Sequence, residues 1–243
     1  MPLRLLTYNI RHGGNGGRLA AVGEVGAAAR PDVAAVQELR GLPPLDRVTG
    51  MRLHVAHPRT GQPVGLLVAP HVEILAAGRV RRPFHHAAAW VRVATAEGPL
   101  TVVSTHLFPY WGTLRLLEAR WLAGFARRHG PVVVMGDLNS LSPAQRHPVV
   151  PRRHRTWWGR GGVDTRAMAL LARRGLVDVF QEIGEGQDWT VPTGLGGGEF
   201  TRSRLDYVLA SRAVAGRFTS CRVLTGAGAA SASDHFPLLA TIR

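Results

Sequence analysis

Cysteine is nearly absent from this sequence, and lysine is absent altogether. The 243 residues contain one cysteine, Cys221, which excludes an intrachain disulfide framework and a zinc site built from cysteines. Long apolar runs are also missing, because a run such as 131–135 is far too short to cross a membrane. The first ten residues lack the apolar core and the cleavage site of a secretory signal. These absences predict a soluble, cytoplasmic protein with no transmembrane segment.

The net charge is strongly positive, and arginine alone carries it. The chain has 30 arginines and 16 acidic residues, which gives a formal net charge of +14. Such a surface attracts nucleic acids, anionic lipids and phosphorylated metabolites alike. A GC-rich coding sequence gives the same arginine surplus, and the 29 glycines fit that explanation. Charge alone therefore does not identify the partner.

The pattern of apolar residues predicts one α+β domain over residues 1–243. Apolar residues make up 45% of the chain, which is enough for a packed core, and no repeat or linker marks a boundary. We expect sheets that pack together with helices outside, in a monomer. The expected strands are 3–9, 33–37, 53–55, 64–68, 72–75, 90–95, 100–105, 132–136, 205–209, 218–224 and 236–242, and the expected helices are 18–30, 112–128 and 165–174. Segments 13–17 and 140–162 are expected to be loops.

Polar residues suited to catalysis follow several of these strands. Because strand ends project side chains into a shared cleft, functional sites are usually built there. Asp137 and Asn139 face the same side of an extended chain, where the carboxylate can take a proton or orient a water and the amide can hold a phosphate oxygen. Gly136 before them allows a close approach of backbone or ligand. An Asx turn that closes the strand explains the same residues without any function.

Glu38 and Asn9 are candidate metal ligands. Glu38 follows a buried strand, so its carboxylate must be paired, hydrated or bound to a metal. Mg²⁺ prefers one or two carboxylates together with waters and phosphate oxygens, and Asn9 would add another oxygen. A salt bridge from Glu38 to an arginine such as Arg40 is the alternative.

Asp206 and His235 are a candidate acid–histidine pair. Asp206 is the only charge inside an otherwise apolar strand, and such a pair fixes the imidazole tautomer and stabilises its protonated form. The alternative for Asp206 is an ion pair with Arg204 or Arg202. His106, which closes another strand, is by itself equally consistent with a structural role.

Six polar segments lie at strand ends, at residues 7–10, 36–38, 104–107, 135–139, 204–209 and 233–237. In this order they resemble the endonuclease/exonuclease/phosphatase superfamily, which includes DNase I, AP endonucleases, neutral sphingomyelinases and inositol polyphosphate 5-phosphatases. The resemblance covers the chain from Asn9 to His235. It implies a four-layer α/β/β/α sandwich, in which two packed mixed β-sheets are flanked by helices. It also implies hydrolysis of a phosphoester with a divalent metal, Mg²⁺ or Mn²⁺.

The resemblance assigns a role to each catalytic candidate. Asp137 and Asn139 match the motif that positions the attacking water and the phosphate. Asp206 and His235 look like the Asp–His pair of the family. His106 looks like the histidine that contacts phosphate and is proposed as general acid.

The metal site implied by the resemblance contains Glu38 as principal ligand, with Asn9 and Asp234. Together with Asp137 and Asp206, this gathers four carboxylates in one place. Like-charge repulsion makes such a cluster costly unless a cation neutralises it. A metal ion and a protonated histidine would offset that cost.

Departures from individual branches bear on the substrate. Arg11 stands where the AP-endonuclease branch carries an acid, and His106 stands where that branch tends to use tyrosine; both count against an abasic-site enzyme. The disulfides of DNase I cannot form with one cysteine. The segment 37–40 nevertheless resembles a DNase I-like segment whose arginine, here Arg40, touches DNA.

Loop 140–162 supplies further substrate-binding candidates. Arginine suits phosphates and tryptophan suits base stacking, although a solvated basic loop is the alternative. The candidates are Arg152, Arg153, Arg155, Trp157 and Trp158.

We expect a phosphodiesterase or nuclease with a phosphorylated anionic substrate, DNA or RNA. A phosphatase or phosphodiesterase for a small phosphorylated metabolite or lipid head group is the alternative, and a silent nucleic-acid-binding module would have lost an acid or His235.

Overall fold

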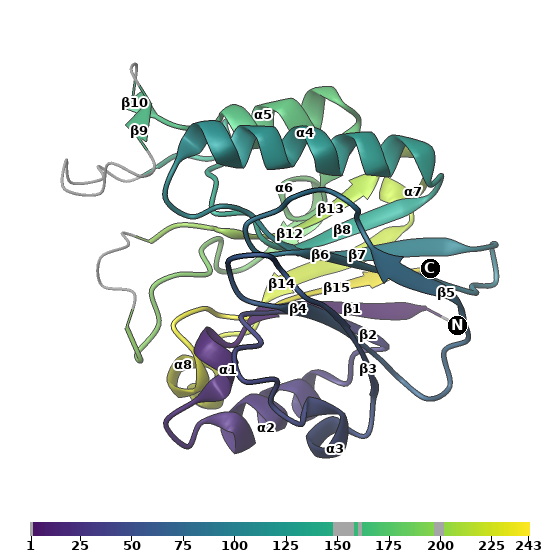
Figure 1. Ribbon diagram of the computed structural model, residues 1–243, viewed down its shortest axis with the longest axis vertical. Helices are drawn as coiled ribbons and strands as arrows, with labels where there is room; N and C mark the ends of the chain where they lie inside the picture. The colour runs from purple at the N-terminus through teal and green to yellow at the C-terminus, as the bar shows by residue number, and fades with distance from the viewer. Residues whose placement is uncertain (1, 148–157, 160–161, 197–201) are drawn as a thin grey trace.

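The structure, a computed structural model, describes residues 2–147, 158–159, 162–196 and 202–243. Two β-sheets pack against each other, and helices cover the outer face of each sheet (Figure 1). The predicted α+β class and the α/β/β/α sandwich of two mixed sheets are therefore confirmed.

The first sheet has seven strands in the order β12-β14-β15-β1-β2-β4-β3. Strand β1 lies in the middle, antiparallel to β15 and parallel to β2. The strands are β1 (Leu3–Asn9), β2 (Val33–Gln37), β3 (Arg52–Ala56), β4 (Val64–Val68), β12 (Gly184–Glu185), β14 (Phe218–Val223) and β15 (Leu238–Ile242).

The second sheet has six strands in the order β11-β13-β8-β7-β6-β5. The strands are β5 (Ile74–Arg79), β6 (Ala88–Val93), β7 (Leu100–His106), β8 (Val132–Asp137), β11 (Leu176–Asp178) and β13 (Asp206–Ser211). Strand β8 is buried along its whole length, because the first sheet covers one face and helices cover the other. This explains its unbroken run of apolar residues.

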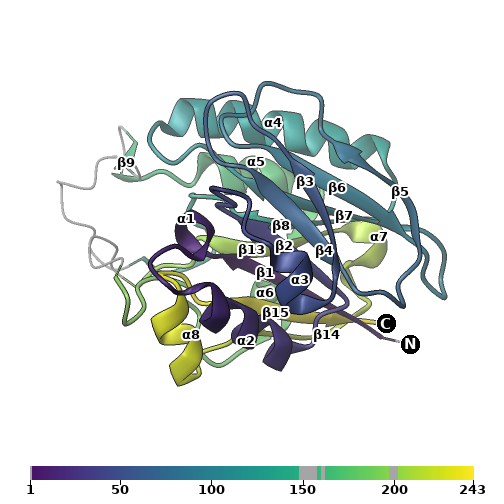
Figure 2. The same ribbon diagram turned by 60° about the horizontal axis from the view of Figure 1, so that its bottom comes forward.

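Helices form the two outer layers. Helices α4 (Gly112–Arg128) and α5 (Arg166–Arg173) lie over the six-stranded sheet, and α2 (Leu19–Ala29), α3 (Leu45–Thr49) and α8 (Ala227–Ala232) lie below the seven-stranded sheet (Figures 1 and 2). The remaining helices are the short α1 (Arg11–Gly14), α6 (Val179–Ile183) and α7 (Arg212–Ala215). In the described part of the chain, no helix combines the length and apolar character that crossing a bilayer requires.

The core has two main parts, one on each face of the six-stranded sheet. Successive residues of β7 point to opposite faces, so Val102 packs between the sheets while Val103 packs under the helices. Met135 of β8 joins the first cluster, and Leu122 of α4 joins the second. This alternation fixes which strand residues reach the interface between the sheets.

Helices α3, α6, α7 and α8 and strands β11 and β12 form where no element is expected, and three expected segments differ most from their prediction. The strand expected at 72–75 begins only at Ile74, because a turn joins the Val72 amide to the Ala69 carbonyl. The expected glycine-rich loop begins as α1, in which His12 and Gly13 have left-handed backbone angles. The expected loop 140–162 contains a small ladder of β9 (Trp158–Gly159) with β10 (Gly162–Val163).

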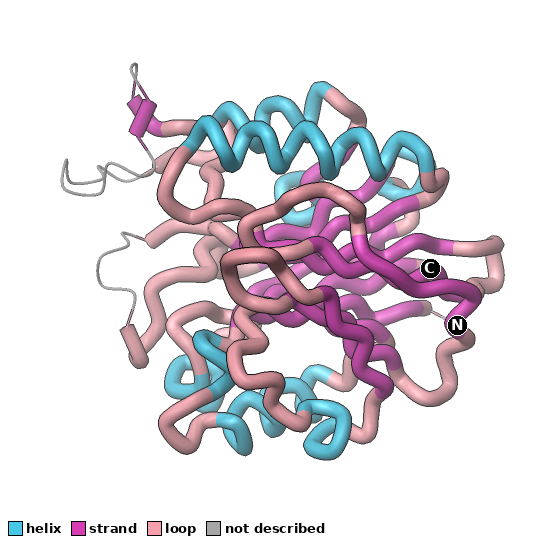
Figure 3. The backbone as a smooth tube through the Cα atoms, viewed as in Figure 1, coloured by secondary structure: helices cyan, strands magenta, loops and turns pink. Residues whose placement is uncertain are grey.

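The two chain ends and the loops that carry the polar residues lie at opposite ends of the sandwich (Figure 3). Strand β1 runs from the N-terminus toward these loops and ends at Asn9. The polar strand ends predicted from the sequence therefore gather at one edge.

Arg204 forms a buried ion pair with Asp178 next to this edge, where β11 ends and β13 begins. Its side chain is 1% exposed, lies over the rings of Phe180 and Tyr207, and donates two hydrogen bonds to Asp178, at 2.8 Å and 2.9 Å. Arg204 is thus committed to Asp178, which leaves Asp206 for another partner.

Replacing Asp178 by alanine should lower the free energy of unfolding by about 3–5 kcal/mol, because the buried guanidinium would lose its counter-charge. Urea denaturation measures this loss. Asp46→Ala, on the exposed side of α3, is the control and should change stability little. Equal losses in the two variants would contradict the structural role of the pair.

Candidate active site

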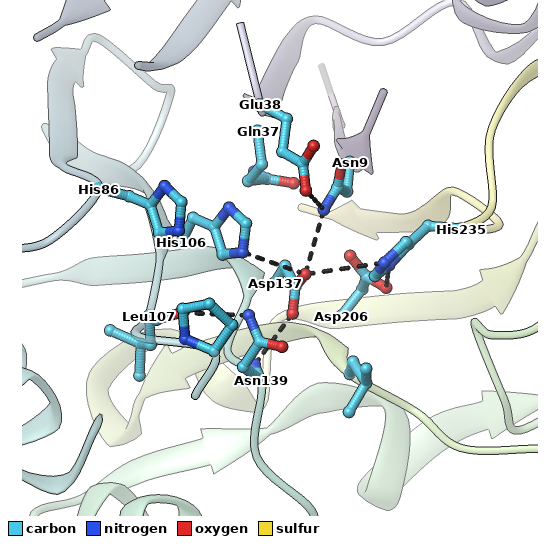
Figure 4. A network of polar contacts seen from close by, with 12 residues as sticks. Asn9, Gln37, Glu38, His86, His106, Leu107, Asp137, Asn139, Asp206 and His235 are labelled. Atoms are coloured by element: carbon cyan, nitrogen blue, oxygen red, sulfur yellow. Dashed lines mark hydrogen bonds and ion pairs between the residues drawn. The ribbon is translucent and has the colours of Figure 1, made fainter. Parts of the chain in front are cut away.

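Strand register brings three of the predicted residues into one row. Asp137 at the end of β8 lies opposite His106 of β7 on one side and opposite Asp206 of β13 on the other. The polar contacts around Asp137 are drawn in Figure 4, in which it lies at the centre.

Asp137 is 2% exposed, and polar groups surround its carboxylate. Its Oδ2 atom accepts a hydrogen bond from Asn9 Nδ2 at 3.1 Å and lies 3.4 Å from His106 Nε2 and 3.7 Å from His235 Nε2. Its Oδ1 atom accepts a hydrogen bond from the Asn139 backbone amide at 2.9 Å. Burial raises the pKa of Asp137, and the two histidines only partly offset that effect.

His235 and Asp206 form the expected pair, with 2.8 Å between Nδ1 and Oδ2. Burial alone would lower the pKa of His235, but the carboxylates of Asp206 and Asp137 outweigh it and raise this pKa to about 10. The imidazole is therefore protonated at neutral pH. The other oxygen of Asp206, Oδ1, is buried without a hydrogen-bond partner in the described residues.

Asn9 links the two sheets at the site. Its Nδ2 donates to Glu38 Oε1 at 3.2 Å as well as to Asp137, so one amide spans the carboxylates at the ends of both sheets. Glu38 also accepts a hydrogen bond from the backbone amide of His12 at 2.9 Å. Arg40, the alternative partner of Glu38, has an exposed side chain.

Glu38 is ionised at neutral pH. Burial alone would raise its pKa, but the charge of His106 and the hydrogen bonds from His12 and Asn9 lower it to about 2. Because 16% of the side chain is exposed, this carboxylate is accessible to an ion from solvent.

The donor set fits a cation that keeps most of its water molecules. Among the residues that the structure describes, no three acidic, histidine or cysteine side chains converge as a metal cage. Asp234 lies 3.4 Å from Arg11 Nε, and Asn9 Oδ1 accepts a hydrogen bond from the Arg11 backbone amide. Glu38 Oε2 lies 3.2 Å from His12 Nδ1, but unlike Asp234 this carboxylate has no arginine partner among the described residues. It is thus the candidate to meet a cation, and Mg²⁺ is commonly held by one or two carboxylates plus waters. Metal ligation by Asn9 and Asp234 stays a prediction.

Gly136 and Asn139 shape the chain around Asp137. A Cβ atom on Gly136, whose φ is +150°, would lie 1.8 Å from the Thr105 carbonyl oxygen. Glycine therefore permits the close approach of β7 at this point, as the sequence indicated for backbone or ligand. Asn139 has a φ of 46° and donates through Nδ2 to the Leu107 carbonyl at 3.1 Å.

Sequence reasoning missed His86, which stacks on His106 with 3.9 Å between ring centroids and 2° between ring planes. It also missed Glu118 of α4, which accepts hydrogen bonds from the backbone amides of His85 at 2.7 Å and Phe108 at 2.6 Å. Glu118 thereby fixes the segments beside both stacked rings. His85 and His86 precede β6, and a search of both ends of every strand would have found them.

The structure describes only one of the remaining substrate-binding candidates. Arg152, Arg153, Arg155 and Trp157 lie outside the described residues. Trp158 belongs to β9 by its backbone.

The model of the endonuclease/exonuclease/phosphatase family matches residues 6–235. The chain belongs to this family. It is similar to a solved family member from Bacteroides thetaiotaomicron, with a TM-score of 0.73 and 16% identity over 100% of this chain and 97% of that one. It is also similar to the endonuclease domain of TRAS1, a telomere-specific non-LTR retrotransposon (TM-score 0.69, 20% identity, 100% and 99% covered), and to truncated Caenorhabditis elegans TDP2 (TM-score 0.70, 15% identity, 100% and 97% covered). No curated protein matches the sequence.

Glu118 should give stability a distinctive pH dependence. Burial raises its pKa to about 7 in the folded protein, although the amides of His85 and Phe108 and the charge of Arg115 act against this. An acid with a raised pKa stabilises the fold fully below its unfolded value, near 4.5, and that contribution is lost as the pH rises to about 7. The stability of the wild type relative to Glu118→Ala should therefore fall between these pH values.

Urea unfolding of both proteins across this pH range measures the difference. A gap between the two proteins that stays constant with pH would contradict the raised pKa.

Proposed function

We propose that this protein is a divalent-metal-dependent phosphodiesterase that cleaves nucleic acid by attack of water on phosphorus. The observation that carries the proposal is the buried Asp137 carboxylate, which has the protonated His235 on one side and His106 on the other. Such a grouping offers a proton acceptor next to a fixed positive charge, as phosphoester hydrolysis requires. The endonuclease named among its structural neighbours agrees with a nucleic-acid substrate.

In the proposed mechanism, Asp137 and Asn139 orient the attacking water, and Asp137 takes its proton. His235 stays protonated and stabilises the negative charge that develops on the phosphoryl oxygens. Asp206 acts through His235, because its 2.8 Å contact with Nδ1 keeps Nε2 pointed at the reacting group. His106 contacts the phosphate and protonates the leaving oxygen.

Glu38 would hold the metal, with Asn9 beside it and Asp234 as a further contributor. A bound divalent cation supplies neutralisation of charge on the phosphate. Glu38 serves this role because it is ionised and partly exposed, unlike the buried Asp137. A monomeric state and a cytoplasmic location stay predictions.

Purified protein should cleave plasmid DNA, single-stranded DNA or RNA with Mg²⁺ or Mn²⁺, and EDTA should abolish cleavage. Asp137→Asn and His235→Ala should each lower kcat by about 10²–10⁴-fold, since each removes a proton acceptor or a charge at the reacting phosphate. Asp46→Asn, an exposed acid of α3, is the matched control and should retain activity.

Full turnover in EDTA, or in both site variants, would refute this mechanism. Release of phosphate from small phosphomonoesters with all nucleic acids left intact would instead select a phosphatase for a small phosphorylated molecule. Binding without turnover on any substrate would select a silent binding module.

A further inference from the structure

A basic pocket of about 440 Å³ lies beside the stacked histidines. The segment after β3 and the segment between β5 and β6 form its walls. The lining side chains with charge or a titratable ring are those of His57, Arg59, Arg79, Arg81, Arg82 and His86. Among the described residues, no acid lines this pocket.

Hydrogen bonds tie the two walls together. The Gly61 amide donates to the His85 carbonyl at 2.7 Å, and the Gln62 amide donates to His86 Nδ1 at 2.8 Å. A Cβ atom at Gly61 would lie 2.6 Å from His86 Nδ1, so the two segments approach as closely as glycine allows. The pocket is therefore a built feature rather than a chance gap between two loops.

The arginines of the pocket lack counter-charges. Arg59, Arg79, Arg81 and Arg82 are all exposed, and none makes an ion pair with a carboxylate in the described parts of the chain. Four like charges around one hollow repel each other, and an anion between them would relieve that repulsion.

A buried donor also lacks a partner at this place. His86 is 5% exposed, and since Nδ1 accepts from Gln62, the proton of the neutral ring lies on Nε2. This Nε2 atom is buried and has no hydrogen-bond partner among the described residues. The exposed guanidinium groups, which have no carboxylate partner in the described residues, are the groups able to bind a phosphate here, and the buried His86 ring forms part of the wall beneath them.

The pocket continues the row of catalytic residues along the sheet edge. Its wall residue His86 stacks on His106, and Arg79 pairs in register with Ala89 at the same end of the sheet. Strands lie about 4.8 Å apart, so β5, three strands from β8, is about 14 Å from Asp137. A substrate that fills both places must carry at least two phosphates along an extended chain.

We propose that the pocket around Arg59, Arg79, Arg81 and Arg82 binds a phosphate of the nucleic-acid substrate other than the one that is cleaved. This rests on the proposed function and assigns to the same site an extended nucleic-acid strand that crosses from Asp137 over His106 to the pocket. The pocket supplies affinity and position, and the catalytic row supplies the chemistry.

The test measures binding in EDTA, where cleavage does not interfere. Fluorescence anisotropy of a labelled single-stranded DNA oligonucleotide gives the Kd at several salt concentrations. Arg81→Ala/Arg82→Ala should raise the Kd about tenfold or more and reduce the slope of log Kd against log salt by about 0.7 for each lost phosphate contact. Arg81→Lys/Arg82→Lys keeps the charge and should restore most of the binding.

Arg127→Ala/Arg128→Ala is the matched control. These adjacent exposed arginines lie in the last turn of α4, which leads into the start of β8 and so lies far from Asp137. Equal losses in the two alanine pairs would show attraction by net charge alone and would overturn the proposal. Circular dichroism and thermal unfolding of each variant verify that it is folded.

Inorganic tripolyphosphate as competitor separates a small polyphosphate from a nucleic acid. If it displaces the oligonucleotide at concentrations as low as unlabelled oligonucleotide does, the pocket serves a small polyphosphate and the assignment to nucleic acid is overturned. A wild type that binds in EDTA but cleaves nothing with metal refutes the proposed function and leaves the pocket in place. Unchanged Kd in the pocket variant refutes the pocket alone.

Discussion

The architecture of the site depends on one buried carboxylate, whose negative charge must be balanced by neighbouring groups. Asp137 is almost inaccessible to water, so an uncompensated charge there would be very costly. The groups that compensate it come from different places: Asn9 from the seven-stranded sheet, His106 from the neighbouring strand and His235 from the segment before β15. Because residues from both sheets contact Asp137, this network is complete only when the two sheets are packed together.

The use of acidic residues explains much of the surface charge. Asp137, Asp164, Asp206 and Glu118 are buried, where they hold histidines, arginines or backbone amides. Of these four acids, Asp164 pairs with an exposed arginine, Arg166, whereas Asp137, Asp206 and Glu118 contact histidines or backbone amides instead. The surplus of +14 is therefore borne largely by exposed arginines, and at the pocket beside His86 they gather where no acid of the described chain lines the hollow.

Local sequence signals predict packed sheets with helices outside, and the family resemblance adds the four-layer order and the set of candidate site residues. The unbroken apolar run of β8 and the helical spacing of α4 each reflect burial by the layers around them, and both elements form where expected. Asp206 was conspicuous as a lone charge in an apolar strand, and its partner is His235. The stack of His86 on His106, the Arg11–Asp234 pair and the contacts of Glu118 were not predictable, because each joins segments whose approach depends on the whole fold.

Backbone angles at the site show that fold stability and the side chains of the proposed site make opposite demands on the same residues. In the described residues, six non-glycine residues have a positive φ, and four of them, Arg11, His12, Glu38 and Asn139, surround the proposed metal and water positions. Left-handed angles cost L-amino acids roughly 1–2 kcal/mol each, a cost that glycine avoids. Glycine at these positions would relax the chain yet delete the Glu38 and Asn139 side chains, which the proposed mechanism uses. A laboratory selection for heat resistance alone would thus favour glycine at these positions and drift toward a protein that lacks the proposed site.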